Sequence, residues 1–163
     1  MLRFHPDALF LMFGTNDSVG GTAGLQKFVE NYVEVVTRAR DAGVGLVVIQ
    51  TAVPMLLVNP DALIELAHYA DKRTRDSKLN GLRMRLEHLP AYAEAAREAA
   101  RQLNAPLIDH WSVWEAVGGA RGQLLDGGFH PNEYGHRLIA HTIFRVCGIW
   151  NEKGWTCRLF VPI

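Results

Sequence analysis

Apolar residues follow two different spacings along the chain, and each spacing predicts a different kind of element. Residues 8–13 form an uninterrupted apolar run that ends at Gly14, which is typical of a strand buried on both faces of a parallel sheet. Residues 44–50 form a second such strand, and residues 106–109 a shorter third one. Within residues 25–40, apolar side chains instead recur at helical spacing and predict a helix with one buried face.

The same pattern predicts the remaining elements. A helix is expected over residues 90–103, one or two helical turns over residues 111–117, and a final helix that Asn132 caps and that runs to about Cys147. Residues 61–69 favour a short helix, and residues 71–85 are charged and either helical or mobile. Residues 118–128 are expected to be a glycine-rich loop. Strands that alternate with helices indicate a single α/β domain over residues 1–163, in which residues 151–163 are an extension that can add an edge strand.

Composition and charge exclude several classes of protein. The 163 residues are 48% hydrophobic and 21% charged, which excludes a disordered chain. Lys plus Arg and Asp plus Glu both number 17, so nothing in the net charge favours nucleic acid or an anionic membrane as a partner. No apolar run approaches the ~20 residues of a membrane span. Cys147 and Cys157 are interpreted as free thiols. The histidines lack metal-binding spacing, so no metal or other cofactor is expected.

Two loops carry residues that suit catalysis. Gly14, Thr15, Asn16 and Asp17 follow the first strand, where the Asn16 amide can donate a hydrogen bond to a developing oxyanion. The alternative is that Asn16 and Asp17 form an Asx turn that caps the next segment, and these four residues alone favour this alternative.

The second loop carries His130, which directly precedes Pro131 and the capping Asn132. A histidine on such a rigid loop can act as a general base, and Asp126 can hold its ring in the correct tautomer. The alternative is a surface histidine on a glycine-rich loop.

Taken together, Gly-Thr-Asn-Asp at a strand end and Asp-Gly-Gly-Phe-His-Pro-Asn before the last helix resemble the SGNH or GDSL hydrolase superfamily over residues 4–147. The resemblance implies a three-layer α/β/α, flavodoxin-like fold and a serine ester hydrolase without a cofactor. In this family's terms Asn16 is the oxyanion donor, His130 the catalytic base and Asp126 its orienting acid. The motif positions around them are Gly14, Thr15, Asp17, Pro131 and Asn132. Expected substrates are small-molecule or glycan esters: a short-chain acyl ester, an acetylated sugar or a lysophospholipid.

The sequence departs from the family pattern in two places. It contains neither the Gly-Asp-Ser block of the nucleophile nor a Gly-x-Ser-x-Gly motif, and its first strand matches the family's third. These features predict an N-terminally truncated hydrolase whose nucleophilic serine is not in this chain. Ser18 follows the first motif, but it is interpreted as a loop serine that bonds to the backbone. The second departure is that Gly127 stands three residues before His130, where the family has Asp. Either a bulged loop lets Asp126 reach His130, or a backbone carbonyl orients the ring.

Further expectations follow from the missing nucleophile and the charge pattern. The chain can instead be a non-catalytic remnant, a subunit or a binding domain of the same fold. Truncation would leave residues 8–13 as an apolar sheet edge, which predicts self-association. Because this reasoning predicts that the true N-terminus is absent, cytoplasmic and secreted locations both stay open. A basic stretch predicts a solvated helix face or, alternatively, attraction of an anionic substrate; it comprises Lys72, Arg73, Arg75, Lys78, Arg83 and Arg85.

Overall fold

The computed structural model describes residues 2–56 and 71–162, which fall into two compact units. The first unit contains residues 1–52 and 83–109, and the second contains residues 53–82 and 110–163. Helix α3 (Lys72–Gln102) contributes residues to both units. The short helix expected over residues 61–69 lies outside the described residues.

A three-stranded parallel sheet forms the centre of the first unit, in the order β1-β2-β3. Its strands are β1 (Ala8–Met12), β2 (Leu46–Gln50) and β3 (Leu107–Ile108). Helix α1 (Leu25–Asp41) connects β1 to β2, because parallel neighbours need a crossover rather than a tight turn. The three predicted strands, the first predicted helix and the α/β class with a parallel sheet are thereby confirmed.

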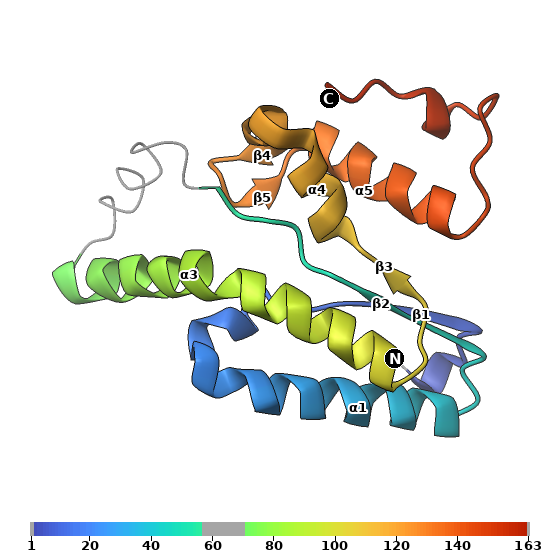
Figure 1. Ribbon diagram of the computed structural model, residues 1–163, viewed down its shortest axis with the longest axis horizontal. Helices are drawn as coiled ribbons and strands as arrows, with labels where there is room; N and C mark the ends of the chain where they lie inside the picture. The colour runs from blue at the N-terminus through green and yellow to red at the C-terminus, as the bar shows by residue number, and fades with distance from the viewer. Residues whose placement is uncertain (1, 57–70, 163) are drawn as a thin grey trace. The chain divides into compact units, whose positions relative to one another are not determined.

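One face of this sheet carries the core of the unit. In the register of β1 and β2, Leu9 lies opposite Val47 and Leu11 lies opposite Ile49, and all four side chains are buried. Helix α1 and the second half of α3 cover them (Figure 1). The helices contribute Phe28, Tyr32, Val36, Ala39, Tyr92, Ala96, Ala99 and Ala100 to this core.

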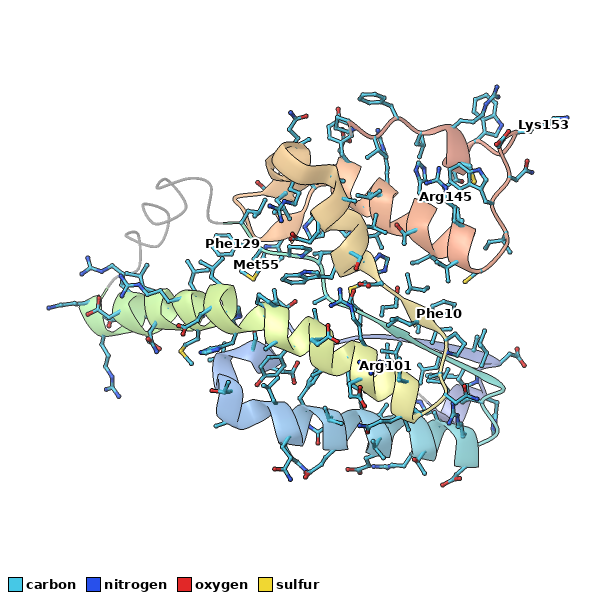
Figure 2. The ribbon with its side chains drawn as sticks, viewed as in Figure 1. Phe10, Met55, Arg101, Phe129, Arg145 and Lys153 are labelled. Atoms are coloured by element: carbon cyan, nitrogen blue, oxygen red, sulfur yellow. The ribbon has the colours of Figure 1, made fainter. Side chains whose placement is uncertain are left out.

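The other face of β1 is more open than the sequence predicted. Phe10 (Figure 2) and Met12 are 40% and 37% exposed, whereas Leu9 and Leu11 are buried. The expected burial of this strand on both faces is therefore wrong, because α1 and α3 pack only against the face that carries Leu9 and Leu11. Among the described strands, β1 pairs with β2 alone, so that it forms an edge of the sheet.

Helix α3 begins at Lys72, so the helical alternative for residues 71–85 is confirmed, and it continues without a break into the helix that was expected to begin at Pro90. Pro90 cannot donate a backbone hydrogen bond, which normally weakens a helix interior. Here Leu89 and Tyr92, on either side of Pro90, are both about 1% exposed, so burial holds the helix on both sides of the proline. No helix in the described ranges is long and apolar enough to cross a membrane.

The second unit is built from short elements around a separate core. They are α4 (His110–Val117), the 3-10 helix Gly118–Leu124, β4 (Leu125–Asp126), β5 (His130–Pro131) and α5 (Glu133–Val146). Trp114, Leu124, Leu125 and Leu138 form the centre of this core together with Val53. The predicted final helix is confirmed, but the expected loop over residues 118–128 is in fact a 3-10 helix followed by a hairpin.

The C-terminal tail also differs from its expected form. Residues 151–162 contain a 3-10 helix, Thr156–Arg158, and no strand. Side chains of α5 bind the tail's backbone, because Arg137 Nη1 donates to the Phe160 carbonyl at 3.1 Å and His141 Nε2 lies 3.0 Å from the Thr156 carbonyl. The edge strand was therefore the wrong expectation for this segment. Cys147 and Cys157 are both free.

We propose that the exposed edge of β1 drives self-association, because an apolar edge strand with unpaired backbone groups is a template for another strand. Phe10→Lys should reduce the association, since a lysine on an edge strand opposes strand pairing. Sedimentation velocity over a concentration series measures the effect. Val33→Lys on α1, where Val33 is 37% exposed, is the matched control and should leave association unchanged. A monomer at every concentration would contradict the proposal.

Candidate functional site

The loop after β1 is closed by hydrogen bonds around Gly14. The Asp17 carboxylate accepts from the Gly14 amide at 3.1 Å, and the Gly14 carbonyl accepts from the Ser18 amide at 2.9 Å. Gly14 has φ 121°, a conformation that L side chains rarely adopt. A Cβ at Gly14 would also lie 3.6 Å from Tyr92 Cβ. That distance is ordinary van der Waals contact, so the backbone conformation rather than the space favours glycine here.

Asn16 holds the N-cap position of the 3-10 helix Asp17–Gly20, yet its side chain makes no cap hydrogen bond. The Asp17 carboxylate instead bonds back to Gly14, three residues earlier, so neither side chain makes the expected Asx turn or caps the segment that follows. The Asn16 side chain is exposed, and its Oδ1 accepts from Arg85 Nη2 at 3.3 Å. Its Nδ2 group has no hydrogen bond to any described residue. The amide donor is thus available to a ligand.

Ser18 is fully buried, and its Oγ donates to the Thr15 carbonyl at 2.9 Å. This contact confirms the interpretation of Ser18 as a loop serine that bonds to the backbone. The chain's other serines, Ser77 and Ser112, lie within helices α3 and α4 rather than at a strand end.

Tyr92 of α3 holds the glycine-rich part of this loop. Its hydroxyl donates to the Gly21 carbonyl at 2.9 Å, and a Cβ at Gly20 would lie 3.3 Å from that hydroxyl. A Cβ at Gly24 would overlap it outright. The sequence analysis did not identify this role of Tyr92; the cluster of glycines Gly20, Gly21 and Gly24 is the signal that a side chain approaches the backbone here.

Two tyrosine hydroxyls stay protonated near this loop. The pKa of Tyr32 is raised to about 12, chiefly by burial and to a smaller extent by the Asp17 carboxylate, while the bond from the Phe13 amide to the Tyr32 hydroxyl lowers it. The pKa of Tyr92 is also raised, first by burial and then by Asp17.

This shift has a consequence for stability at alkaline pH. The folded pKa of Tyr32, about 12, exceeds its ordinary 10.0, so the folded state favours the protonated hydroxyl. The resulting stabilisation is complete below pH 10 and is lost as the pH rises toward 12. Over that interval the free energy of unfolding of the wild type should fall by on the order of 2 kcal/mol more than that of Tyr32→Phe. Urea unfolding across the interval measures it. Tyr134→Phe is the control, and an unchanged slope in Tyr32→Phe would refute the assignment.

The second motif forms a tight β-hairpin. Asp126 in β4 pairs with His130 in β5, and the Phe129 amide donates to the Asp126 carbonyl at 3.1 Å. Gly127 and Gly128 have φ 55° and 79°, the pattern of a type I′ turn, which needs positive φ at both central residues. Phe129 lies at this turn (Figure 2).

The hairpin places Asp126 and His130 on the same face. Directly opposed residues of an antiparallel pair have Cβ atoms roughly 5 Å apart. Asp126 is thus the cross-strand neighbour of His130. Both side chains are exposed, and no hydrogen bond or ion pair joins them in the described part of the chain.

Asn132 fixes the position of His130 relative to α5. Its Oδ1 accepts from the amides of Tyr134 at 2.9 Å and Gly135 at 3.1 Å, which confirms the predicted cap. Its Nδ2 donates to the Gln123 carbonyl at 2.8 Å. One side chain therefore connects the helix start to the segment before the hairpin.

Gly135, in the first turn of α5, is packed tightly against that same segment. A Cβ there would overlap the Leu124 carbonyl oxygen and lie 3.0 Å from both Pro131 Cβ and Trp114 Cη2. The close approach brings α5 against the strand that carries His130, so His130 rests on a rigid support.

We expect Gly135→Ala to destabilise the protein by about 1–3 kcal/mol, because the new methyl group has no space. A loss of stability would be diagnostic of the close packing, since alanine normally stabilises a helix interior by about 1 kcal/mol relative to glycine. Thermal or urea unfolding measures the change. Gly119→Ala, where a Cβ would meet nothing within 4 Å, is the matched control. A Gly135→Ala protein as stable as the wild type would show that the packing is looser.

The structure assigns the predicted site residues to two groups. Gly14, Thr15, Asn16 and Asp17 belong to the first unit, whereas Asp126, His130, Pro131 and Asn132 belong to the second. The contact between Arg85 and Asn16 could not be predicted from sequence. Arg85 lies 69 residues after Asn16 and stands out there only as one member of a basic stretch. Over residues 2–56 and 71–162, no cluster of His, Cys, Asp and Glu could hold a metal ion.

Comparison with known proteins identifies a family model that covers most of the chain. The model of the GDSL-like lipase/acylhydrolase family matches residues 1–138. The chain is also 28% identical over 157 residues to YqeF of Bacillus subtilis (strain 168), an uncharacterized lipoprotein. That match covers 88% of this chain and 63% of YqeF.

Solved structures share the fold. A catalytic mutant of Axe2, an acetylxylan esterase from Geobacillus stearothermophilus, has a TM-score of 0.62 and 15% identity, over 92% of this chain and 63% of that one. A lipase/acylhydrolase from Enterococcus faecalis has a TM-score of 0.58 and 22% identity, over 94% of this chain and 68% of that one. The chain thus spans about two thirds of the length of these proteins.

Proposed function

Because this chain belongs to the GDSL-like lipase/acylhydrolase family, we propose that residues 1–163 serve as a single hydrolase-like domain in the cleavage of carboxylic esters. The observation that carries the proposal is the pair of family motifs on rigid supports. Asn16 lies in the loop after β1 with a free amide donor, and His130 precedes a helix that is capped by Asn132.

In this proposal His130 is the general base. It takes the proton from an attacking serine hydroxyl and later returns it to the leaving alcohol. The serine lies outside this chain, since Ser18 is buried and bonded to the backbone. Asp126 stabilises the imidazolium that forms on His130. Its place opposite His130 in the hairpin supports this role, since directly opposed side chains of an antiparallel pair are near neighbours.

Asn16 supplies a hydrogen bond to the oxygen that becomes negative when the tetrahedral intermediate forms. A donor fixed in advance is effective because it need not reorganise during the reaction, and one such donor is worth about 2.7–4 kcal/mol. Gly14, Asp17 and Tyr92 give this loop its shape, so that Asn16 projects from a fixed backbone.

An acetylated carbohydrate or a short-chain acyl ester is the proposed substrate class. What supports it is the shared fold with an acetylxylan esterase, together with the equal numbers of acidic and basic residues, which favour no nucleic acid. The substrate is therefore taken to be a small molecule or a glycan ester.

The test is hydrolysis of p-nitrophenyl acetate by the complete gene product. We expect His130→Ala to lower kcat by at least about 1000-fold, since a triad base cannot be replaced by solvent. His136→Ala is the matched control, because His136 is an exposed histidine one turn into α5.

Full activity in His130→Ala would disprove the assignment of the base. A fluorophosphonate probe gives a second readout, since it labels an activated serine. Stoichiometric labelling that mapped to Ser18 would contradict the proposed origin of the nucleophile.

A further inference from the structure

We propose that Arg85 is a positioning residue that sets the orientation of the Asn16 carboxamide, an inference that rests on the proposed function of Asn16. A carboxamide has an acceptor end and a donor end, and rotation by half a turn exchanges them. Arg85 can only donate, and its Nη2 lies 3.3 Å from Asn16 Oδ1. The rotated form would place the Asn16 NH2 group against the guanidinium, donor against donor. Arg85 therefore selects the form in which both Nδ2 protons are directed away from it.

The packing of α3 on the loop keeps Arg85 in reach of Asn16. A Cβ at Gly21 would lie 3.1 Å from Met84 Cε and 3.4 Å from His88 Nε2, so the turn of α3 around Arg85 rests directly on the loop. The bond from the Tyr92 hydroxyl to the Gly21 carbonyl holds the same loop from the next turns of the helix. The Arg85–Asn16 contact thus joins two segments whose backbones are already fixed.

The charge of Arg85 is also available to Asn16. Within residues 2–56 and 71–162 no ion pair engages Arg85: the Asp17 carboxylate accepts from Gly14, and Glu87 faces His88 at 3.9 Å. A cation at Oδ1 polarises the carboxamide, and a polarised amide donates a stronger hydrogen bond from its NH2 group. Arg85 consequently orients the donor and strengthens it, although it need not contact the substrate.

Nuclear magnetic resonance of the 15N-labelled chain tests the orientation without requiring activity. The Asn16 side-chain amide is assigned by its loss in Asn16→Asp. We expect an ordered amide, with a high heteronuclear NOE, in the wild type and a shifted, mobile amide in Arg85→Gln. Arg85→Lys should restore part of the order, because lysine keeps the charge but loses the planar fork. Arg83→Gln, on an exposed arginine of the same helix, is the matched control. An amide that is unchanged in Arg85→Gln would overturn the proposal.

Kinetics of the complete gene product separate this proposal from the proposed function. We expect Arg85→Gln to lower kcat by up to about 100-fold with little change in KM, and to cause no further loss in an Asn16→Ala background. A loss in Asn16→Ala without any loss in Arg85→Gln would overturn the role of Arg85 and leave the oxyanion role standing. No loss in either variant would instead refute the oxyanion role of Asn16, while the amide resonances still decide whether Arg85 orients it.

Discussion

The contact between Tyr92 and the glycine-rich loop is the interaction on which the rest of the first unit depends. The Tyr92 ring packs edge-on against Phe28, with ring centroids 5.0 Å apart, and its hydroxyl donates to the Gly21 carbonyl. One buried side chain therefore joins α1, α3 and the loop that carries Asn16. Because Arg85 lies on the same helix two turns earlier, its reach to Asn16 also depends on this contact.

In the second unit, short elements hold the candidate residues in place. A type I′ turn sets the pairing of Asp126 with His130, and the Asn132 side chain caps α5 immediately after it. Gly135 then allows the helix to approach the chain before the hairpin as closely as backbone atoms permit. Each group of candidate catalytic residues thus lies at a strand end or helix start that is held by hydrogen bonds and by close packing.

Most elements could be predicted from the spacing of apolar residues, and the errors have physical reasons. Helix α1 and the first two strands follow their apolar patterns closely. Helix α3 extends through Pro90 because burial of Leu89 and Tyr92 outweighs one lost backbone hydrogen bond. Local helix propensity does not include this burial. Side chains of α5 bind the tail, and these contacts cannot be predicted from the pattern of polar and apolar residues within the tail.

The sequence by itself determined the family, the α/β class, and the candidate roles of Asn16 and His130, because these depend on residue type and on short spacings. It also determined the Asn132 cap, since capping is a local interaction. Only the tertiary structure decided that the Asp17 carboxylate bonds back to Gly14 and that Ser18 is buried. It also decided that Arg85 meets the Asn16 carboxamide. The side-chain partner of an exposed amide is set by how helices pack on loops, and that packing joins residues far apart in the chain.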